Sequence, residues 1–165
     1  MLMKTFLGKR TAAIVVTAIV GLGVAACAPP PAPAGGGSPS DPFTASLFSS
    51  LNADRAAHGL PGLSWNSQLG SNASSWAHQM GNAGSLYHQN LGGLISSPSY
   101  AGFYTLGENI LVGPGSMSAA SVESAWIHSP PHYANITSRS FNVVGIGYYR
   151  GPDGRIWAAQ EFGGV

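Results

Sequence analysis

The sequence predicts an α+β fold in which helices pack on a small antiparallel sheet. Apolar residues recur at helical spacing in three segments, 41–59, 67–81 and 118–128. Near the end of the chain, two segments rich in strand-forming residues flank a Gly-Pro-Asp-Gly turn. Helices and a hairpin are therefore both present, and we expect a single domain over 41–165.

The first 26 residues have the pattern of a secretion signal. Three basic residues precede an apolar run, and small residues then lead to Cys27. This arrangement is similar to a bacterial lipoprotein cleavage site, so we expect residues 1–26 to be removed and Cys27 to be lipidated. The alternatives are a membrane-spanning anchor or cleavage elsewhere, but about a dozen apolar residues fall short of the roughly 20 that span a bilayer.

Residues 27–40 are rich in proline and glycine and are expected to form a tether. We therefore expect a monomer held through lipidated Cys27 at the extracytoplasmic face of the cell membrane. Because Cys27 is the only cysteine, no disulfide can stabilise the domain. After removal of the signal, four arginines and no lysine face six acidic residues. That balance excludes nucleic acid as a partner, because phosphate backbones require clustered basic residues.

The first helix is expected to begin at the N-cap Asp41, with Pro42 in its first turn. His58 in its last turn suits the helix dipole and is interpreted as structural. The second helix follows the cap Asn66. His78 lies opposite its apolar face and is expected to be solvated.

Residues 91–105 lack periodicity and are expected to form a surface loop. Tyr100, Phe103 and Tyr104 would supply its apolar rim. The apolar run 110–112 predicts a central strand, with Glu108 at its entrance.

The third helix is expected to stop at Pro130 and Pro131. Glu123 lies beside its apolar face, so a solvated carboxylate is the default expectation. Trp76 and Trp126, at helical spacings, are expected in the core. Gly145 and Gly147 on the first hairpin strand would let another element approach the sheet closely.

His88, Glu108 and His132 form the candidate site. They recur at intervals of about twenty residues in a domain with few other ionisable groups. Two imidazoles and a carboxylate suit zinc or another divalent cation such as magnesium. The same set could instead hold three chain segments together by hydrogen bonds, or catalyse hydrolysis with Glu108 as general base.

Taken in order, several motifs resemble the CAP or SCP domain, the family of cysteine-rich secretory proteins, antigen 5 and plant pathogenesis-related protein 1. The motifs are Leu51–Arg55, Leu63–Asn66, His88, Gly107–Ile110, Ala125–Ile136 and Trp157–Gly163. The resemblance implies a three-layer α-β-α sandwich with a long cleft, whose floor would carry the candidate site. The adjoining cleft residues would be Asn109, Ser129, Tyr133 and Asn135.

The chain departs from the family pattern at two places. Many eukaryotic relatives have a second glutamate three residues after the tryptophan of the third helix, where this chain has Ser129. The usual bacterial Ser-Pro-Gly-His-Arg also reads Ser-Pro-Pro-His-Tyr, which ends at Tyr133 and makes the turn stiffer.

Two functional hypotheses follow from this reading. The first is a non-enzymatic binding module with a divalent cation at the His/Glu/His cluster and a lipid or cell-envelope ligand in an apolar cleft. The alternative is a metal-assisted hydrolase, a peptidase or cell-wall hydrolase, that uses the same cluster with Glu108 as the catalytic base.

Overall fold

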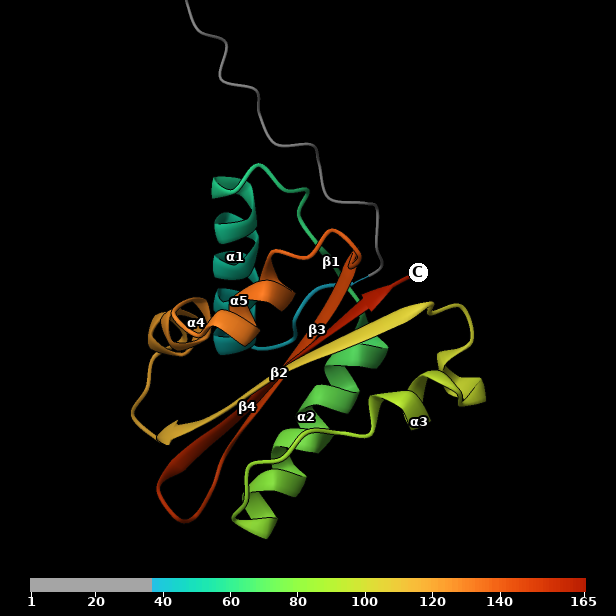
Figure 1. Cartoon of the computed structure of the whole chain (residues 1–165). Helices are drawn as coiled ribbons and strands as arrows, with labels where there is room; N and C mark the ends of the chain where they lie inside the picture. Colours follow the sequence, from blue (N-terminus) through green and yellow to red (C-terminus); the bar gives the residue numbers. More distant parts are fainter. Residues whose placement is uncertain (1–36) are drawn as a thin grey trace, which may run out of the picture.

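The computed structural model describes residues 37–165 (Figure 1). The predicted signal, the lipidation site at Cys27 and most of the predicted tether lie outside the described residues. Five α-helices are present within 37–165: α1 (Pro42–Ala57), α2 (Ser67–Ala83), α3 (Leu91–Ile95), α4 (Ala119–Ile127) and α5 (Pro130–Ile136). A 3-10 helix, η1, spans Pro98–Tyr100. The strands are β1 (Ser64–Trp65), β2 (Thr105–Pro114), β3 (Val143–Arg150) and β4 (Arg155–Gly164).

The four strands form one mixed sheet in the order β1-β3-β4-β2. The β3–β4 hairpin and the β4–β2 pair are antiparallel, as expected, but β1 pairs parallel to β3. The prediction of a central strand at 110–112 was wrong, because β2 occupies an edge of the sheet. Its apolar run reflects helices packed on both faces, and this packing buries an edge strand as well.

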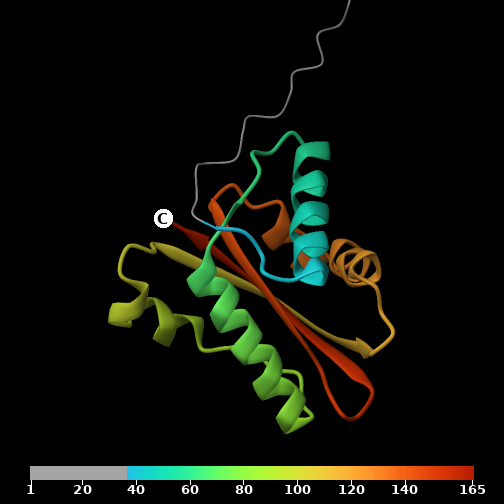
Figure 2. The same ribbon diagram turned by 180° about the vertical axis from the view of Figure 1, so that it is seen from behind.

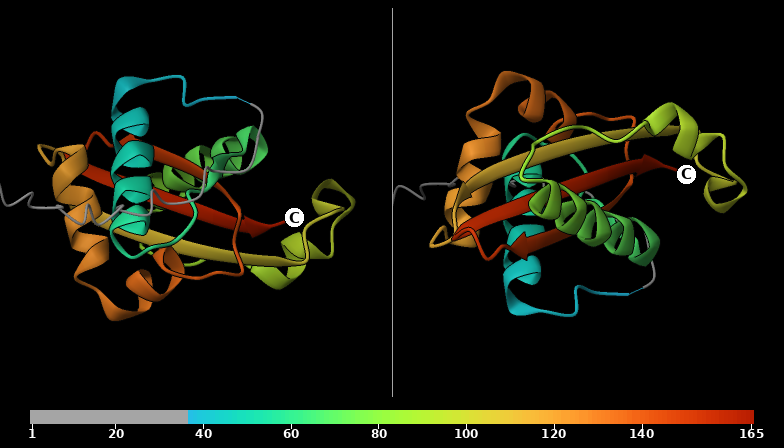
Figure 3. Two further views of the ribbon diagram at one scale, coloured as in Figure 1. Left: turned by 90° about the horizontal axis from the view of Figure 1, so that it is seen from above. Right: turned by 90° about the horizontal axis from the view of Figure 1, so that it is seen from below.

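Helices cover both faces of the sheet, which confirms the three-layer sandwich (Figures 1 and 2). One face carries α1, α4 and α5, and the other carries α2; Figure 3 shows the two faces in turn. Trp126, Ile136 and Phe162 belong to the core on the first face. Trp157 and Met80 belong to the core on the second. Side chains alternate along each strand, so neighbouring residues contribute to opposite faces.

Gly145 and Gly147 set the distance between α2 and the sheet. A Cβ at Gly145 would lie 2.0 Å from the backbone nitrogen of Gly70, and one at Gly147 would lie 2.2 Å from that of Ser74. These positions therefore permit a close approach of backbone to backbone, as the sequence predicts.

Two short segments differ from the expectation. Residues 91–105 contain α3 and η1 and are not a continuous loop. The two prolines after α4 begin a new helix, α5, because proline suits the first turn. Within residues 37–165, no helix has the length and apolar character needed to cross a membrane.

Candidate functional site

His88 lies in the segment that connects α2 to α3. Gly84 ends α2 in the left-handed conformation, with φ of 63°, and turns the chain away from the helix. The ring of Trp76 then holds the returning segment: its Nε1 donates to the carbonyl of Tyr87 at 3.1 Å, and the two rings meet edge to face at 4.9 Å. His88 is thereby fixed beside the sheet while its side chain stays 59% exposed.

Glu108 is the buried partner of His88. Its side chain is fully buried in β2, and its Oε1 lies 2.7 Å from His88 Nδ1. A carboxylate only accepts hydrogen bonds, so the proton belongs to Nδ1 and the neutral imidazole keeps a free lone pair on Nε2. The buried carboxylate of Glu108 therefore sets both the orientation and the tautomer of the exposed His88 ring.

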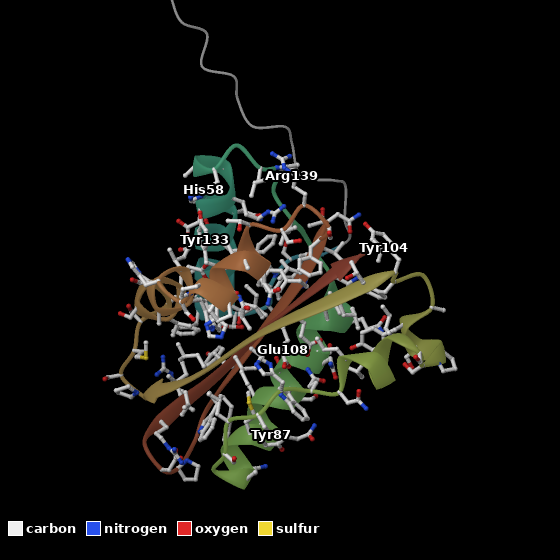
Figure 4. All side chains as sticks on the ribbon, viewed as in Figure 1. His58, Tyr87, Tyr104, Glu108, Tyr133 and Arg139 are labelled. Carbon is white, nitrogen blue, oxygen red and sulfur yellow. The ribbon has the colours of Figure 1, made fainter. Side chains whose placement is uncertain are left out.

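Gln89 completes the hydrogen bonding of Glu108. Its backbone nitrogen donates to Oε1 at 3.1 Å, and its Nε2 donates to Oε2 at 2.9 Å. Both carboxylate oxygens of Glu108 are consequently occupied. Figure 4 shows Glu108 on the sheet beside the connecting segment that carries the neighbouring Tyr87.

Glu161 is a second buried carboxylate in this cluster, and the sequence reasoning did not select it. It is the register partner of Glu108 on β4 and is 3% exposed. Gln89 Nε2 donates to it at 2.6 Å, and Asn72 Nδ2 donates to both of its oxygens at 2.9 Å. A charged residue between the apolar residues 156–159 and Phe162 was the available signal.

Burial raises the pKa of Glu161 to about 7, and the charge of Glu108 adds to this effect. The hydrogen bonds from Asn72 and Gln89 act in the opposite direction. The two carboxylates share one donor side chain, which lowers the cost of burying two acids together.

His132 approaches from the other face of the sheet. It lies in α5, which is fastened to β2 by amide side chains: Asn109 Nδ2 donates to the carbonyl of His132 at 3.1 Å, and Asn135 Nδ2 donates to the carbonyl of Glu108 at 3.1 Å. Because β2 is an edge strand, groups on its two faces can meet around that edge.

The Nδ1 atom of His132 is buried and has no hydrogen-bond partner among residues 37–165. Burial lowers the pKa of His132, and the charge of His88 lowers it further. The two imidazoles are therefore close enough to repel when protonated, and the neutral form of His132 is favoured.

The residues present fit a cation held by the imidazole nitrogens of His88 and His132 better than one that Glu108 also coordinates. Residues 37–165 contain no group of three His, Cys, Asp or Glu side chains placed to hold a metal ion. The reason lies in Glu108, whose two oxygens already accept from His88 and Gln89.

The aromatic residues expected at an apolar rim are divided between core and surface. Tyr100 is only 5% exposed and belongs to a buried cluster with Leu69, so its placement on a rim was wrong. Phe103 packs against it with ring centroids 5.3 Å apart. Tyr104 is 66% exposed. Tyr100 ends η1 and packs with Leu69 of α2 and Val143 of β3, and no periodic pattern in the sequence predicted α3 or η1.

The remaining cleft candidates, Ser129, Tyr133, Asn109 and Asn135, have other contacts. Ser129 precedes α5 without a side-chain cap. The ring of Tyr133 meets that of His58 edge to face at 5.5 Å, and Figure 4 shows the two together. Asn109 and Asn135 bond to each other at 2.9 Å and hold α5 against β2.

Glu123 is buried in α4, so the expectation of a solvated carboxylate was wrong. It is 3% exposed; Gln160 Nε2 donates to its Oε2 at 2.9 Å, while Oε1 has no partner within the described part of the chain. Burial raises the pKa of Glu123 to about 8, and the charge of Asp54 on α1 contributes. Gln160 Oε1 accepts from Asn109 at 3.1 Å, so this network reaches β2 from the face opposite Glu161.

Comparison with known proteins bears on the family and the fold. The sequence profile of the cysteine-rich secretory protein family (CAP) matches residues 48–162. No curated protein sequence matches the chain.

Several solved structures are similar to this one. An outer surface protein of Borrelia burgdorferi has 21% identity and a TM-score of 0.61, over 72% of this chain and 89% of that one. An extracellular protein with an SCP domain from Bacillus anthracis has 22% identity and a TM-score of 0.64, over 78% of this chain and 45% of that one. A cysteine-rich secretory protein of Staphylococcus aureus has 19% identity and a TM-score of 0.62, over 77% of this chain and 40% of that one. This chain thus spans less than half of the last two, and at these identities the likeness shows the fold.

Proposed function

Because this chain belongs to the cysteine-rich secretory protein (CAP) family, we propose that it is an extracytoplasmic binding module that holds a divalent cation between His88 and His132. The observation that carries the proposal is the hydrogen bond between His88 Nδ1 and the buried Glu108 carboxylate. A metal-binding histidine characteristically donates its other ring proton to a carboxylate in this way, which orients the ring and raises its basicity.

In this proposal Glu108 supports a ligand and is not itself one. His88 presents Nε2 to solvent, and His132, whose pKa is lowered by burial, stays neutral and able to coordinate. Imidazole donors suit zinc better than magnesium, which prefers oxygen ligands. The cation would shape the cleft and offer open coordination positions to a ligand.

The hydrolase hypothesis receives less support from the geometry of Glu108. A general base must come within hydrogen-bond reach of the proton that it removes. The Glu108 side chain is fully buried, and both of its oxygens accept hydrogen bonds from neighbouring groups. A role in orienting His88 agrees with these contacts, whereas attack on an envelope substrate would first require them to break.

The remaining parts of the proposal concern location and ligand. We propose that Cys27 carries acyl chains and that the domain lies at the outer face of the cell membrane as a monomer, since two or more acyl chains anchor a protein firmly where one does not.

A lipid or cell-envelope ligand is proposed because exposed apolar side chains flank the site. They are Leu86, at 43% exposure, and Tyr87, at 39%, which directly precede His88 in the chain.

Calorimetric titration with zinc and with magnesium tests the cation site. The chain carrying Cys27→Ser, which cannot be acylated, is compared with the same chain carrying His88→Ala and His132→Ala. Zinc binding that disappears in the double variant is the expected result. A matched control is His78→Ala, because His78 is exposed on α2 and its ring packs against Tyr149 of β3. Equal zinc affinity in all three proteins would overturn the proposal.

The ligand is tested separately by extraction. Protein released from membranes by detergent should carry an apolar molecule that mass spectrometry detects, or should take one up from labelled envelope lipids. If it does neither, the binding-module proposal fails even where a cation binds.

A further inference from the structure

Apart from the proposed cation site, we infer that Arg55 and Arg139 form an anion site that takes a phosphate or carboxylate group. The inference rests on a buried guanidinium without an acidic partner, a second guanidinium beside it, and a cavity that both of them line.

Arg55 is an unusual buried cation. It lies in the last turn of α1 and is 1% exposed. Its Nε donates to the carbonyl of Pro61 at 2.9 Å, and its Nη1 donates to the carbonyls of Ile136 and Ser138 at 2.7 and 2.9 Å. Neutral carbonyls satisfy donors, but they do not neutralise a full charge that has left water.

Arg139 adds a second positive charge at the same place. Burial lowers the pKa of Arg55, and the charge of Arg139 lowers it further, which is the sign of two neighbouring cations. Arg139 is exposed. Within 37–165 the ion pairs are His88 with Glu108 and Arg155 with Asp153, so no acidic side chain pairs with either guanidinium. Arg155 is thus the one arginine of the described residues that pairs with an acid, and Arg55 and Arg139 stay unneutralised in a domain with more acids than bases.

The two arginines open onto a cavity of about 180 Å³. Its other lining residues are Pro61, Gly62, Phe141 and Asn142, none of which is acidic. Guanidinium groups bind phosphate and carboxylate through paired N–H donors, and a water-poor pocket strengthens such bonds. Phe141, at 8% exposure, supplies an apolar wall beside the charged groups. The cavity therefore has the charge, donors and size for a small anionic group.

The site is separate from the candidate cation site. Figure 4 shows Arg139 at the end of the molecule where α1 finishes, away from Glu108 on the sheet. The anion could be free in solution or could be the headgroup of an anionic lipid, and the chemistry that the two arginines recognise is the same. Failure of the cation proposal would leave this inference untouched.

Inorganic phosphate is the probe for the soluble source. Titration of the Cys27→Ser chain, followed by backbone amide shifts, should saturate, with the largest changes around Arg55, Arg139 and Asn142. Arg139→Gln should weaken phosphate binding by about tenfold or more, because a charge-assisted pair of hydrogen bonds is lost. The phosphate affinity of Arg139→Lys should lie between those of the unsubstituted protein and Arg139→Gln, since lysine keeps the charge but lacks the paired donors.

The matched control is Arg155→Gln, which removes the same charge from the start of β4, where Arg155 pairs with Asp153, and should leave phosphate affinity within about twofold. Vesicles of phosphatidylcholine with and without phosphatidylglycerol test the lipid source. Binding that requires phosphatidylglycerol and is lost in Arg139→Gln assigns the headgroup, whereas saturable phosphate binding without vesicle binding assigns a free anion. The inference is overturned if neither probe binds, or if Arg139→Gln and Arg155→Gln behave alike.

Discussion

The carboxylates of Glu108 and Glu161 face each other across β2 and β4, and one side chain, Gln89, donates a hydrogen bond to each of them. Asn72 in turn donates to Gln89 Oε1 at 2.8 Å, which fixes the direction of the Gln89 amide. The orientation of His88 rests on this buried arrangement, because Glu108 can hold the imidazole only while its own position is held.

Replacement of the bridging amide should be costly. Gln89→Leu leaves both carboxylates without shared donors, and we expect the free energy of unfolding to fall by about 2–4 kcal/mol. Urea denaturation measures this change. Gln79→Leu, at an exposed position on α2, is the matched control and should change stability by less than about 0.5 kcal/mol. Equal losses in the two variants would show that the bridge contributes nothing.

Glu161 should make stability depend on pH. Its pKa is raised from 4.5 to about 7 in the folded protein, so the folded state binds this proton more tightly than the unfolded state does. Stability contributed by the protonated acid is therefore lost as pH rises from about 4.5 through about 7, by at most about 1.4 kcal/mol per pH unit. Glu161→Gln, which stays neutral, should flatten that slope in denaturation curves measured at several pH values. An unchanged slope would contradict the assignment.

Glu123 should extend the same trend to higher pH. Its pKa is raised to about 8, so between about pH 7 and pH 8 Glu123 still loses stabilising protonation while Glu161, with a pKa of about 7, completes its ionisation. Glu123→Gln should remove most of the loss of stability in that interval, and Glu161→Gln a smaller part of it. If both variants behave alike above pH 7, the carboxylate of Glu123 is not the responsible group.

Gly147 should not tolerate a methyl group. A Cβ there would lie 2.2 Å from the backbone nitrogen of Ser74, so α2 would have to move away from the sheet. We expect Gly147→Ala to destabilise the domain by about 2–3 kcal/mol, as overpacking does. Gly92→Ala is the control, because a Cβ there meets its nearest atom at 3.6 Å and its φ is ordinary. Similar melting temperatures for the two variants would contradict this account.

Cation affinity should fall on mild acidification. Metal binding requires imidazole without a proton on the coordinating nitrogen, so protons compete with zinc for these ligands as pH falls from about 7.5 to about 5. Calorimetry at the two pH values measures the change, with a fall of about tenfold or more expected. Affinity independent of pH would place the cation elsewhere.

Much of the fold could be predicted because its signals are local. Asp41 and Asn66 cap α1 and α2 with their side chains, as the sequence indicates. The hairpin turn lies where glycine and proline mark it. The approach of His88 to Glu108 was also anticipated, since ionisable residues are scarce in the domain and the resemblance to the CAP family implied a shared site. These features depend on short stretches of sequence or on spacing between motifs.

Other features could not be predicted, because they depend on which strands become neighbours. The pairing of β2 with β4 places Glu161 opposite Glu108, and the burial of Glu123 depends on Gln160 beneath α4. The parallel pairing of β1 with β3 joins segments about eighty residues apart. Tyr100 is buried because η1, which it ends, brings it against Leu69 and Val143, and the sequence of η1 carries no helical period.

By itself, the sequence determined the fold class, the caps and the turns, because hydrogen-bonding caps, rigid prolines and permissive glycines act over a few residues. It also selected His88 and Glu108 as members of one site. Only the tertiary structure decided that Glu108 is an enclosed support for His88, that Glu161 shares its donor, and that Arg55 and Arg139 lie together without an acid. The physical reason is that burial and charge pairing are properties of the surroundings, which long-range packing assembles.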